Sequence, residues 1–176
     1  MSVTEIQGEA SKQPAWWVRV LIGRNPKVTL VRMVISVLLL LVLDKFVFLP
    51  IRVMGISMQP TYTENRIDFV NRLAYLFHSP QRGDIVSIQL AGKHVMYCKR
   101  IVALPGETVA FHEGRLLING QVLEEPYVKG PCNWEHEPEA VGPNEYYVVG
   151  DNRTMDFYDH EQGRAERSRI VGKLLL

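Results

Sequence analysis

The sequence predicts a mainly β, antiparallel, curled or barrel-like domain that follows one N-terminal transmembrane helix. Apolar residues concentrate in residues 33–51, and most of the positive charge that precedes the β region lies before that segment. From residue 52 onward, short runs rich in Val, Ile, Tyr and Leu alternate with turn residues. We therefore divide the chain into a basic segment, an anchor and a β domain, which are residues 1–32, 33–51 and 52–176.

Residues 1–32 carry a net positive charge. The segment contains two acidic residues, Glu5 and Glu9, and five basic ones, which are Lys12, Arg19, Arg24, Lys27 and Arg32. The positive-inside rule then predicts a single-pass protein of the plasma or inner membrane with a cytoplasmic N-terminus. The β domain is expected on the outer face, which is periplasmic or extracellular. Over the whole chain, 20 basic and 19 acidic residues give a charge of +1, so no nucleic-acid partner is expected.

The predicted anchor contains an apolar run, residues 33–43, in which Ser36 is the single polar residue. As a helix, residues 33–51 would reach ~28 Å at ~1.5 Å per residue, about the thickness of a bilayer core. A buried core helix is the alternative, but the basic flank favours contact with the lipid bilayer. A cleaved signal peptide needs small residues just past the run. No alanine occurs between Ala15 and Ala74, so we expect the segment to be retained.

The β domain shows many turn signals, of which Asn119-Gly120 is the strongest two-residue hairpin signal. The stretch Thr108–Leu123 predicts three strands separated by two turns. Helical periodicity is weak in this domain except around Ile67–Phe77. Because so many short strands need their edges closed, the pattern favours a curled or barrel-like sheet.

No metal or cofactor is expected. Cys98 and Cys132 are far from any CxxC spacing, and the five histidines never pair at the spacing of zinc ligands. No Gly-rich stretch matches a dinucleotide or phosphate-binding motif.

Two stretches carry the candidate chemistry. Ser57 follows Gly55 by two residues and precedes a proline by three, which predicts a constrained turn that presents its hydroxyl to a cleft. Lys99 interrupts an otherwise apolar strand, on the same face as Tyr97 and Ile101. Burial favours the neutral form of a lysine, and a neutral amine beside a serine hydroxyl is a general base. The alternatives are an ordinary turn serine and a lysine that reaches solvent.

Five ordered stretches resemble the successive boxes of type I signal (leader) peptidases. They are GISMQPT, RGDIV at 82–86, YCKRIVALPGETV at 97–109, GRLLINGQVLEEPY at 114–127 and YYVVGDNR at 146–153. With the anchor, the resemblance covers nearly everything from the apolar segment to Lys173. It implies a membrane-bound serine endopeptidase, without cofactor, that removes signal (leader) peptides from exported precursor proteins. It also implies that Ser57 is the nucleophile and Lys99 the general base.

The resemblance assigns further roles. The backbone N–H of Ser57 is expected to contribute to the oxyanion hole, and Gly55 stands where some members have an additional hydroxyl. Arg100 and Asp151 match a pair that contact each other in the family. In the family, small apolar pockets select by size the substrate side chains at −1 and −3, counted back from the cleaved bond. The positions that line these pockets correspond here to Ile51, Val53, Met58, Tyr97 and Cys98.

For Cys98 two interpretations remain open, because strand alternation would instead turn its side chain away from Lys99 into the core. A disulfide between Cys98 and Cys132 is a third, weaker interpretation, which an oxidising outer face would allow.

One stretch departs from the family. After GDNR, most members have Ser-x-Asp-Ser-Arg, in which the serine orients the lysine, whereas this chain reads TMDFYDHEQGR. An alignment without gaps puts Asp156 at the serine position, and a two-residue deletion puts Thr154 there. We favour Thr154, because threonine preserves the hydroxyl, whereas a carboxylate beside Lys99 would stabilise the ammonium form and oppose base catalysis.

Three functions fit these observations. The first is a general signal peptidase. The second is a specialised relative that matures one client, such as a pilin of a conjugation or secretion machinery, which the altered last stretch favours. The third is a membrane-anchored binding domain that has lost catalysis and contacts exported segments or an export complex, and the presence of Ser57 and Lys99 weighs against it.

Overall fold

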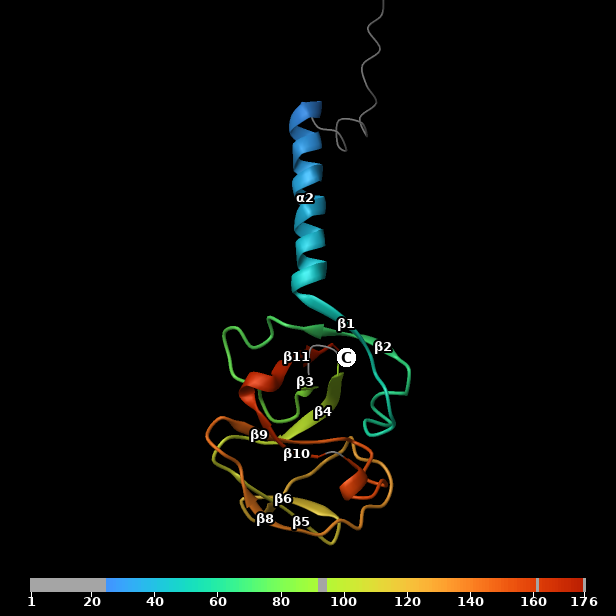
Figure 1. The fold of residues 1–176 in the computed structure, drawn as a ribbon, viewed down its shortest axis with the longest axis vertical. Helices are drawn as coiled ribbons and strands as arrows, with labels where there is room; N and C mark the ends of the chain where they lie inside the picture. The colour runs from blue at the N-terminus through green and yellow to red at the C-terminus, as the bar shows by residue number, and fades with distance from the viewer. Residues whose placement is uncertain (1–24, 92–94, 161, 176) are drawn as a thin grey trace, which may run out of the picture. The chain divides into compact units, whose positions relative to one another are not determined.

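The computed structural model describes residues 25–91, 95–160 and 162–175 (Figure 1). The chain divides into two units, Met1–Val42 and Leu43–Leu176. Most of the predicted basic segment, residues 1–24, lies outside the described residues.

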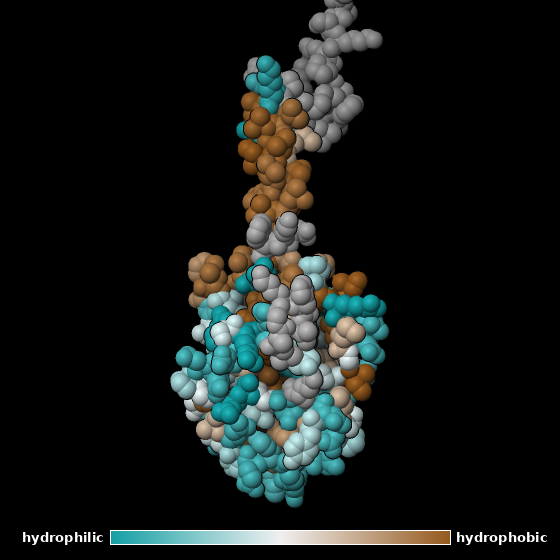
Figure 2. Space-filling model, viewed as in Figure 1, coloured by the Kyte–Doolittle hydropathy of each residue, from teal (hydrophilic) through white to brown (hydrophobic). Residues whose placement is uncertain are grey.

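The one long helix of the described residues, α2, covers Pro26–Phe46. It begins after Asn25, whose side-chain oxygen accepts a hydrogen bond from the backbone N–H of Lys27 at 3.2 Å, as an N-cap residue does. The apolar side chains of α2 are exposed along the helix (Figure 2). Within the part of the chain that the structure describes, no helix has both the length and the apolarity needed to cross a membrane.

A helix that continues to the end of the predicted anchor, residues 33–51, is wrong for the last residues of that segment. The helix ends at Phe46, and Phe48–Arg52 forms strand β1 instead. Pro50 explains the change, since proline disrupts a helix interior but is tolerated in an edge strand. β1 is an edge strand of its sheet, and Pro50 lies opposite Phe69 of the neighbouring strand.

That neighbour, β2 (Ile67–Asn71), corrects the helical interpretation of Ile67–Phe77. Asp68 and Val70 are buried, whereas the alternate residues Ile67 and Phe69 are exposed. This is the two-residue period of a strand and not the 3.6-residue period of a helix.

The remaining strands form two antiparallel sheets with β1 and β2. The larger sheet also contains β3 (Ile85–Ala91), β4 (Val95–Ala103), β9 (Glu145–Val149), β10 (Gly163–Glu166) and β11 (Ile170–Leu174). The smaller contains β5 (Thr108–His112), β6 (Arg115–Ile118), β7 (Gln121–Val122) and β8 (His136–Ala140). Their orders are β1-β2-β11-β3-β4-β9-β10 and β7-β6-β5-β8. The mainly antiparallel β prediction is confirmed. The barrel-like closure is wrong, because within the described residues one sheet ends at β1 and β10 and the other at β7 and β8.

The hairpin predicted at Asn119-Gly120 is confirmed. β6 and β7 pair on either side of these two residues, whose φ angles are 52° and 78°. Positive φ at both central residues is the requirement of a type I′ turn, which glycine and asparagine meet at low cost.

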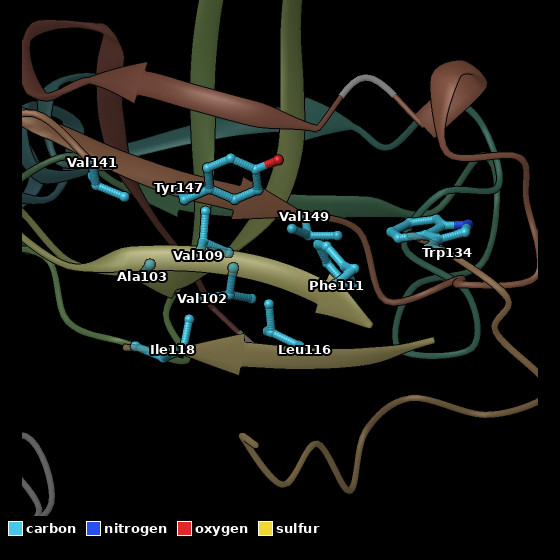
Figure 3. Close-up of a cluster of buried hydrophobic side chains, with 10 residues drawn as sticks. All are labelled: Val102, Ala103, Val109, Phe111, Leu116, Ile118, Trp134, Val141, Tyr147 and Val149. Carbon is cyan, nitrogen blue, oxygen red and sulfur yellow. The ribbon is translucent and has the colours of Figure 1, made fainter. Parts of the chain in front are cut away.

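One buried cluster joins the two sheets. Figure 3 shows its ten side chains, which come from β4, β5, β6 and β9 and from the loops that carry Trp134 and Val141. A separate buried cluster holds the segment after β1 in place and consists of Val53, Met58, Tyr62, Val70, Ile85 and Leu174. These clusters fix the positions of β4 and of the segment after β1, which carry the two candidate catalytic residues.

Candidate active site

Ser57 lies in the turn that follows β1. Gly55 has a φ of 85°, in the left-handed region that favours glycine, and so allows the chain to reverse before the serine. Met58 and Tyr62 are 2% and 0% exposed and anchor the turn to the core. Ser57 itself is half-buried, so its hydroxyl is held by a fixed backbone and still reachable.

Lys99 lies on β4, an interior strand of the larger sheet that pairs with β3 and β9. Its side chain is buried, with 2% of the residue exposed. The Nζ atom is 3.0 Å from Oγ of Ser57 and 2.6 Å from the carbonyl oxygen of His160. The structure thus brings together the two residues that the sequence assigns to the dyad, at hydrogen-bond distance.

His160 is a residue that the sequence interpretation missed. It ends the short 3-10 helix η1 (Tyr158–His160) and is fully buried. Its Nε2 atom lies 3.0 Å from the carbonyl oxygen of Asn152, and its ring packs edge-on against Trp134 at 4.7 Å. Burial, with the neighbouring amine of Lys99 and the guanidinium of Arg153, lowers the pKa of His160 to about 3. The imidazole is therefore neutral at ordinary pH.

Thr154 has a different neighbour from the one that the sequence predicts. It is exposed, and its hydroxyl donates to Oδ1 of Asn152 at 2.6 Å. Asp156, the alternative candidate, is also exposed and accepts the backbone N–H of Tyr158. An acceptor that the structure does place against the amine of Lys99 is the His160 carbonyl.

Arg100 and Asp151 form the pair that the resemblance implies. Nε and Nη2 of Arg100 donate to the two carboxylate oxygens of Asp151 at 2.8 and 2.6 Å. Asp151 is fully buried and also accepts the hydroxyl of Thr61 at 2.5 Å. A buried carboxylate is tolerated when it is paired and hydrogen-bonded in this way. The pair ties β4, next to Lys99, to the turn after β9.

That turn also holds the serine segment. The backbone N–H of Asn152 donates to the carbonyl of Ser57 at 2.9 Å, and its side-chain amide donates to the carbonyl of Ile56 at 3.2 Å. Gly150 permits this approach, because a Cβ there would lie 2.2 Å from the Ser57 carbonyl oxygen and 2.6 Å from Cε1 of His160. The serine turn, the end of β9 and His160 therefore meet at one glycine.

A pocket of about 340 Å³ opens beside the dyad. It contains four of the five predicted pocket residues, which are Val53, Met58, Tyr97 and Cys98. Ile51 instead packs against the buried cluster below. The sequence interpretation missed five lining residues, Met54, Ile56, Met155, Asp159 and His160. The last three come from the stretch that departs from the family, where no motif could identify them.

Cys98 takes both of the roles that the sequence left open. It lines the pocket and also packs against the buried cluster of Val53 and Met58. Cys98 and Cys132 are both free thiols in the structure. Burial, with the nearby carboxylate of Asp68, raises the pKa of the Cys98 thiol to about 12, so it is present almost entirely as the unreactive thiol.

We expect Cys98 of the native protein to react with iodoacetamide at pH 8 more than about 10²-fold more slowly than in the urea-unfolded chain, because the thiolate is the nucleophile. Mass spectrometry of digested protein measures the rate at this position. In the Cys98→Ser variant only Cys132 can be alkylated, so this variant gives the rate of Cys132 alone. Equal rates in the folded and unfolded chain would contradict a half-buried thiol that stays protonated at pH 8.

The low pKa of His160 has a consequence for stability in acid. Below its ordinary pKa of 6.5 the unfolded chain binds a proton at this position, whereas the folded protein does so only near pH 3. The free energy of unfolding should therefore fall as the pH falls from about 6.5, and above that pH the group has no effect. We expect the loss between pH 7 and pH 5, measured by urea unfolding, to be smaller in the His160→Gln variant. The same loss in both proteins would show that His160 is not buried in its neutral form.

No group of three or more His, Cys, Asp or Glu side chains among the described residues is placed to hold a metal ion. The site brings together a buried amine, a serine hydroxyl and a pocket with apolar walls, an arrangement in which the amine can take the proton of an attacking hydroxyl.

Comparison of the sequence with known proteins identifies one family. A sequence profile of the family described as "Signal peptidase, peptidase S26" matches residues 27–176. Signal peptidase I of Leptolyngbya laminosa is 37% identical over 128 residues, which are 68% of this chain and 63% of that protein. This chain therefore spans less than two thirds of that relative's length.

Signal peptidase I V of Bacillus subtilis is 31% identical over 153 residues, which are 79% of this chain and 90% of that protein. A crystal structure of a signal peptidase I from Enterococcus faecalis has a TM-score of 0.45 and 29% identity, and covers 55% of this chain and 97% of that one. On the profile match and the identity to these curated relatives, the chain belongs to the signal peptidase family, peptidase S26.

Proposed function

We propose that this protein is an endopeptidase that cleaves signal peptides from exported precursor proteins, with Ser57 as nucleophile and Lys99 as general base. The observation that carries the proposal is the 3.0 Å distance between Nζ of the buried Lys99 and Oγ of Ser57. A proton can pass directly between two groups at this distance. Family membership and the adjoining apolar pocket support the same activity.

In the proposed mechanism the neutral amine of Lys99 takes the proton of the Ser57 hydroxyl as Oγ attacks the scissile carbonyl carbon. The resulting oxyanion is stabilised by the backbone N–H of Ser57, and Gly55 adds no hydroxyl to it. Collapse of the tetrahedral intermediate breaks the C–N bond, and the proton on Lys99 passes to the leaving amine. Water then hydrolyses the acyl-enzyme, again with Lys99 as the base.

The pocket accounts for substrate choice. Its walls include the apolar side chains of Val53, Met58 and Met155, so we assign it to small apolar residues before the cleaved bond, such as alanine at −1 and −3. An apolar pocket excludes larger side chains by size. Met155 and Asp159 also line the pocket and come from the stretch that departs from the family pattern. On this ground we keep a specialised peptidase that matures one client as the second candidate.

The proposed activity is tested by incubating detergent-solubilised protein with a preprotein that bears an Ala-x-Ala site and, separately, with a pilin precursor. Mass spectrometry of the products identifies the new N-terminus. Cleavage of both supports a general signal peptidase, and cleavage of the pilin precursor alone supports the specialised one. If neither is cleaved, or if a Ser57→Ala preparation cleaves them equally well, the proposed function fails.

We also propose that the protein is attached to the cell membrane through its N-terminal part, with the N-terminus in the cytoplasm. The support is the apolar run of residues 33–43, the basic residues before it, and the exposure of apolar side chains on every side of α2. A helix that is apolar on all sides needs to be covered by lipid or protein.

We expect the full-length protein to remain in the membrane pellet after a wash in alkaline carbonate. A reporter that works only outside the cytoplasm should be active when it is fused after Leu176. Activity from a cytoplasm-dependent reporter at the same position would refute the orientation.

A further inference from the structure

We propose that His160 is a positioning residue that orients the amine of Lys99 and couples it to the turn of Ser57. This inference rests on the proposed function. The position belongs to a stretch that departs from the family pattern, and the role that the resemblance gives to a serine hydroxyl is filled here by a histidine and its own main-chain carbonyl.

The carbonyl oxygen of His160 is a close hydrogen-bond acceptor for the amine of Lys99. It lies 2.6 Å from Nζ of Lys99, whereas Oγ of Ser57 lies 3.0 Å away. A neutral amine has two N–H donors and one lone pair, and a carbonyl can only accept. An N–H of Lys99 must therefore point at the carbonyl, which restricts rotation of the amine to a few orientations, one of which aims the lone pair at the serine hydroxyl.

The imidazole holds this carbonyl in place. Nε2 of His160 lies 3.0 Å from the carbonyl oxygen of Asn152, so Nε2 carries the proton and donates it. Nδ1 is then an acceptor without a hydrogen, and it has no hydrogen-bond partner among the described residues. Of the two ring nitrogens, Nε2 is the one that makes a hydrogen bond among the described residues, and this bond connects the ring to Asn152.

Asn152 carries the connection to the serine. Its backbone N–H donates to the carbonyl of Ser57 at 2.9 Å, and its amide group donates to the carbonyl of Ile56 at 3.2 Å. One residue thus holds the serine turn and, through His160, the acceptor of the lysine amine. We call these hydrogen bonds, which join the serine turn to Asn152 and Asn152 to His160, the frame. The frame and the strand that carries Lys99 together set the distance between the nucleophile Ser57 and the base Lys99.

A packing role alone is the alternative, since the fully buried ring also contacts Trp134. Two variants separate the two roles. His160→Leu introduces an apolar side chain of similar volume and removes the donor, whereas His160→Gln keeps an N–H donor near the position of Nε2. If His160 only fills space, the leucine variant should keep more activity than the glutamine variant. If His160 positions the amine of Lys99, the glutamine variant should keep more.

With a preprotein that the wild type cleaves, we expect His160→Leu to lower kcat by about 10²-fold with little change in KM, because a displacement of about 1 Å has this effect on a positioned reaction. We expect His160→Gln to retain at least about a tenth of the wild-type kcat. A wild-type kcat in a folded His160→Leu protein would overturn the proposal, and so would equal losses in the two variants. If the leucine variant does not fold, His160→Met takes its place as the variant without a donor.

A second readout does not depend on activity. Amide hydrogen exchange at Asn152 should become faster in His160→Leu and stay near the wild-type rate in His160→Gln, because the bond from Asn152 to Ser57 is part of the same frame. Unchanged exchange in the leucine variant would overturn the coupling. If the wild type cleaves no precursor, the proposed function fails while this measurement still decides whether His160 holds the frame.

Discussion

Replacing either Ser57 or Lys99 by alanine should reduce the rate of signal-peptide cleavage by at least about 10³-fold, because the reaction loses its nucleophile or the base that activates it. The two groups act as one unit, since Nζ of Lys99 is 3.0 Å from Oγ of Ser57. The double variant should therefore be no slower than either single variant. Lys99→Arg should not restore activity, because an arginine stays charged and cannot accept the serine proton.

The rate is measured with purified protein in detergent by following the appearance of the mature N-terminus. Ser79→Ala and Lys129→Ala are suitable controls, since both residues are exposed and neither lines the pocket beside the dyad. Both controls should cleave at the wild-type rate. Near-normal turnover by Lys99→Ala would show that this lysine is not the base.

The parts of the fold that sequence could predict are those set by local backbone chemistry. Asn119-Gly120 predicts its hairpin because only a few residue types accept the two positive φ angles that this turn requires. The interruption of an apolar strand by Lys99 likewise indicates a buried amine without knowledge of its neighbours. Both follow from a few adjacent residues.

Features that depend on distant partners could not be predicted in this way. The apolar residues after Phe46 continue the hydrophobic run, and pairing with β2 makes them a strand. Whether a sheet closes depends on which strands pair with each other, and here β1 and β10 form the two edges of the larger sheet. Periodicity over eleven residues was too short a signal to distinguish a helix from β2 and the turns that follow it.

The least predictable part of the site is His160. A lone buried histidine has no sequence signature, and its important atom is the main-chain carbonyl, which every residue has. Its position against Lys99 depends on Asn152 and on the space left by Gly150, both of which lie in a different segment. The resemblance indicated instead that Thr154 supplies the hydroxyl in this stretch, and in the structure that hydroxyl donates to Asn152.

Gly150→Ala is expected to have the second-largest effect, a loss of cleavage of about 10²-fold or more. The added Cβ would lie 2.2 Å from the carbonyl oxygen of Ser57 and 2.6 Å from Cε1 of His160. The first of these atoms is backbone and the second belongs to a fully buried ring, so neither can move without displacing the serine turn or the acceptor of Lys99. Overpacking of this kind also lowers the free energy of unfolding by about 1–3 kcal/mol.

Gly142→Ala is the matched control for this substitution. Neither glycine has a positive φ, so the exchange to alanine differs between them only in what the new methyl group meets. At Gly142 the nearest atom is the carboxylate of Glu145 at 2.7 Å, the end of a flexible side chain that can turn aside. This variant should keep activity within about twofold of the wild type, because the substitution displaces none of the residues that hold the dyad. Equal activity in the two variants, measured with the same precursor at saturating concentration, would show that the close approach at Gly150 does not set the geometry of Ser57 and Lys99.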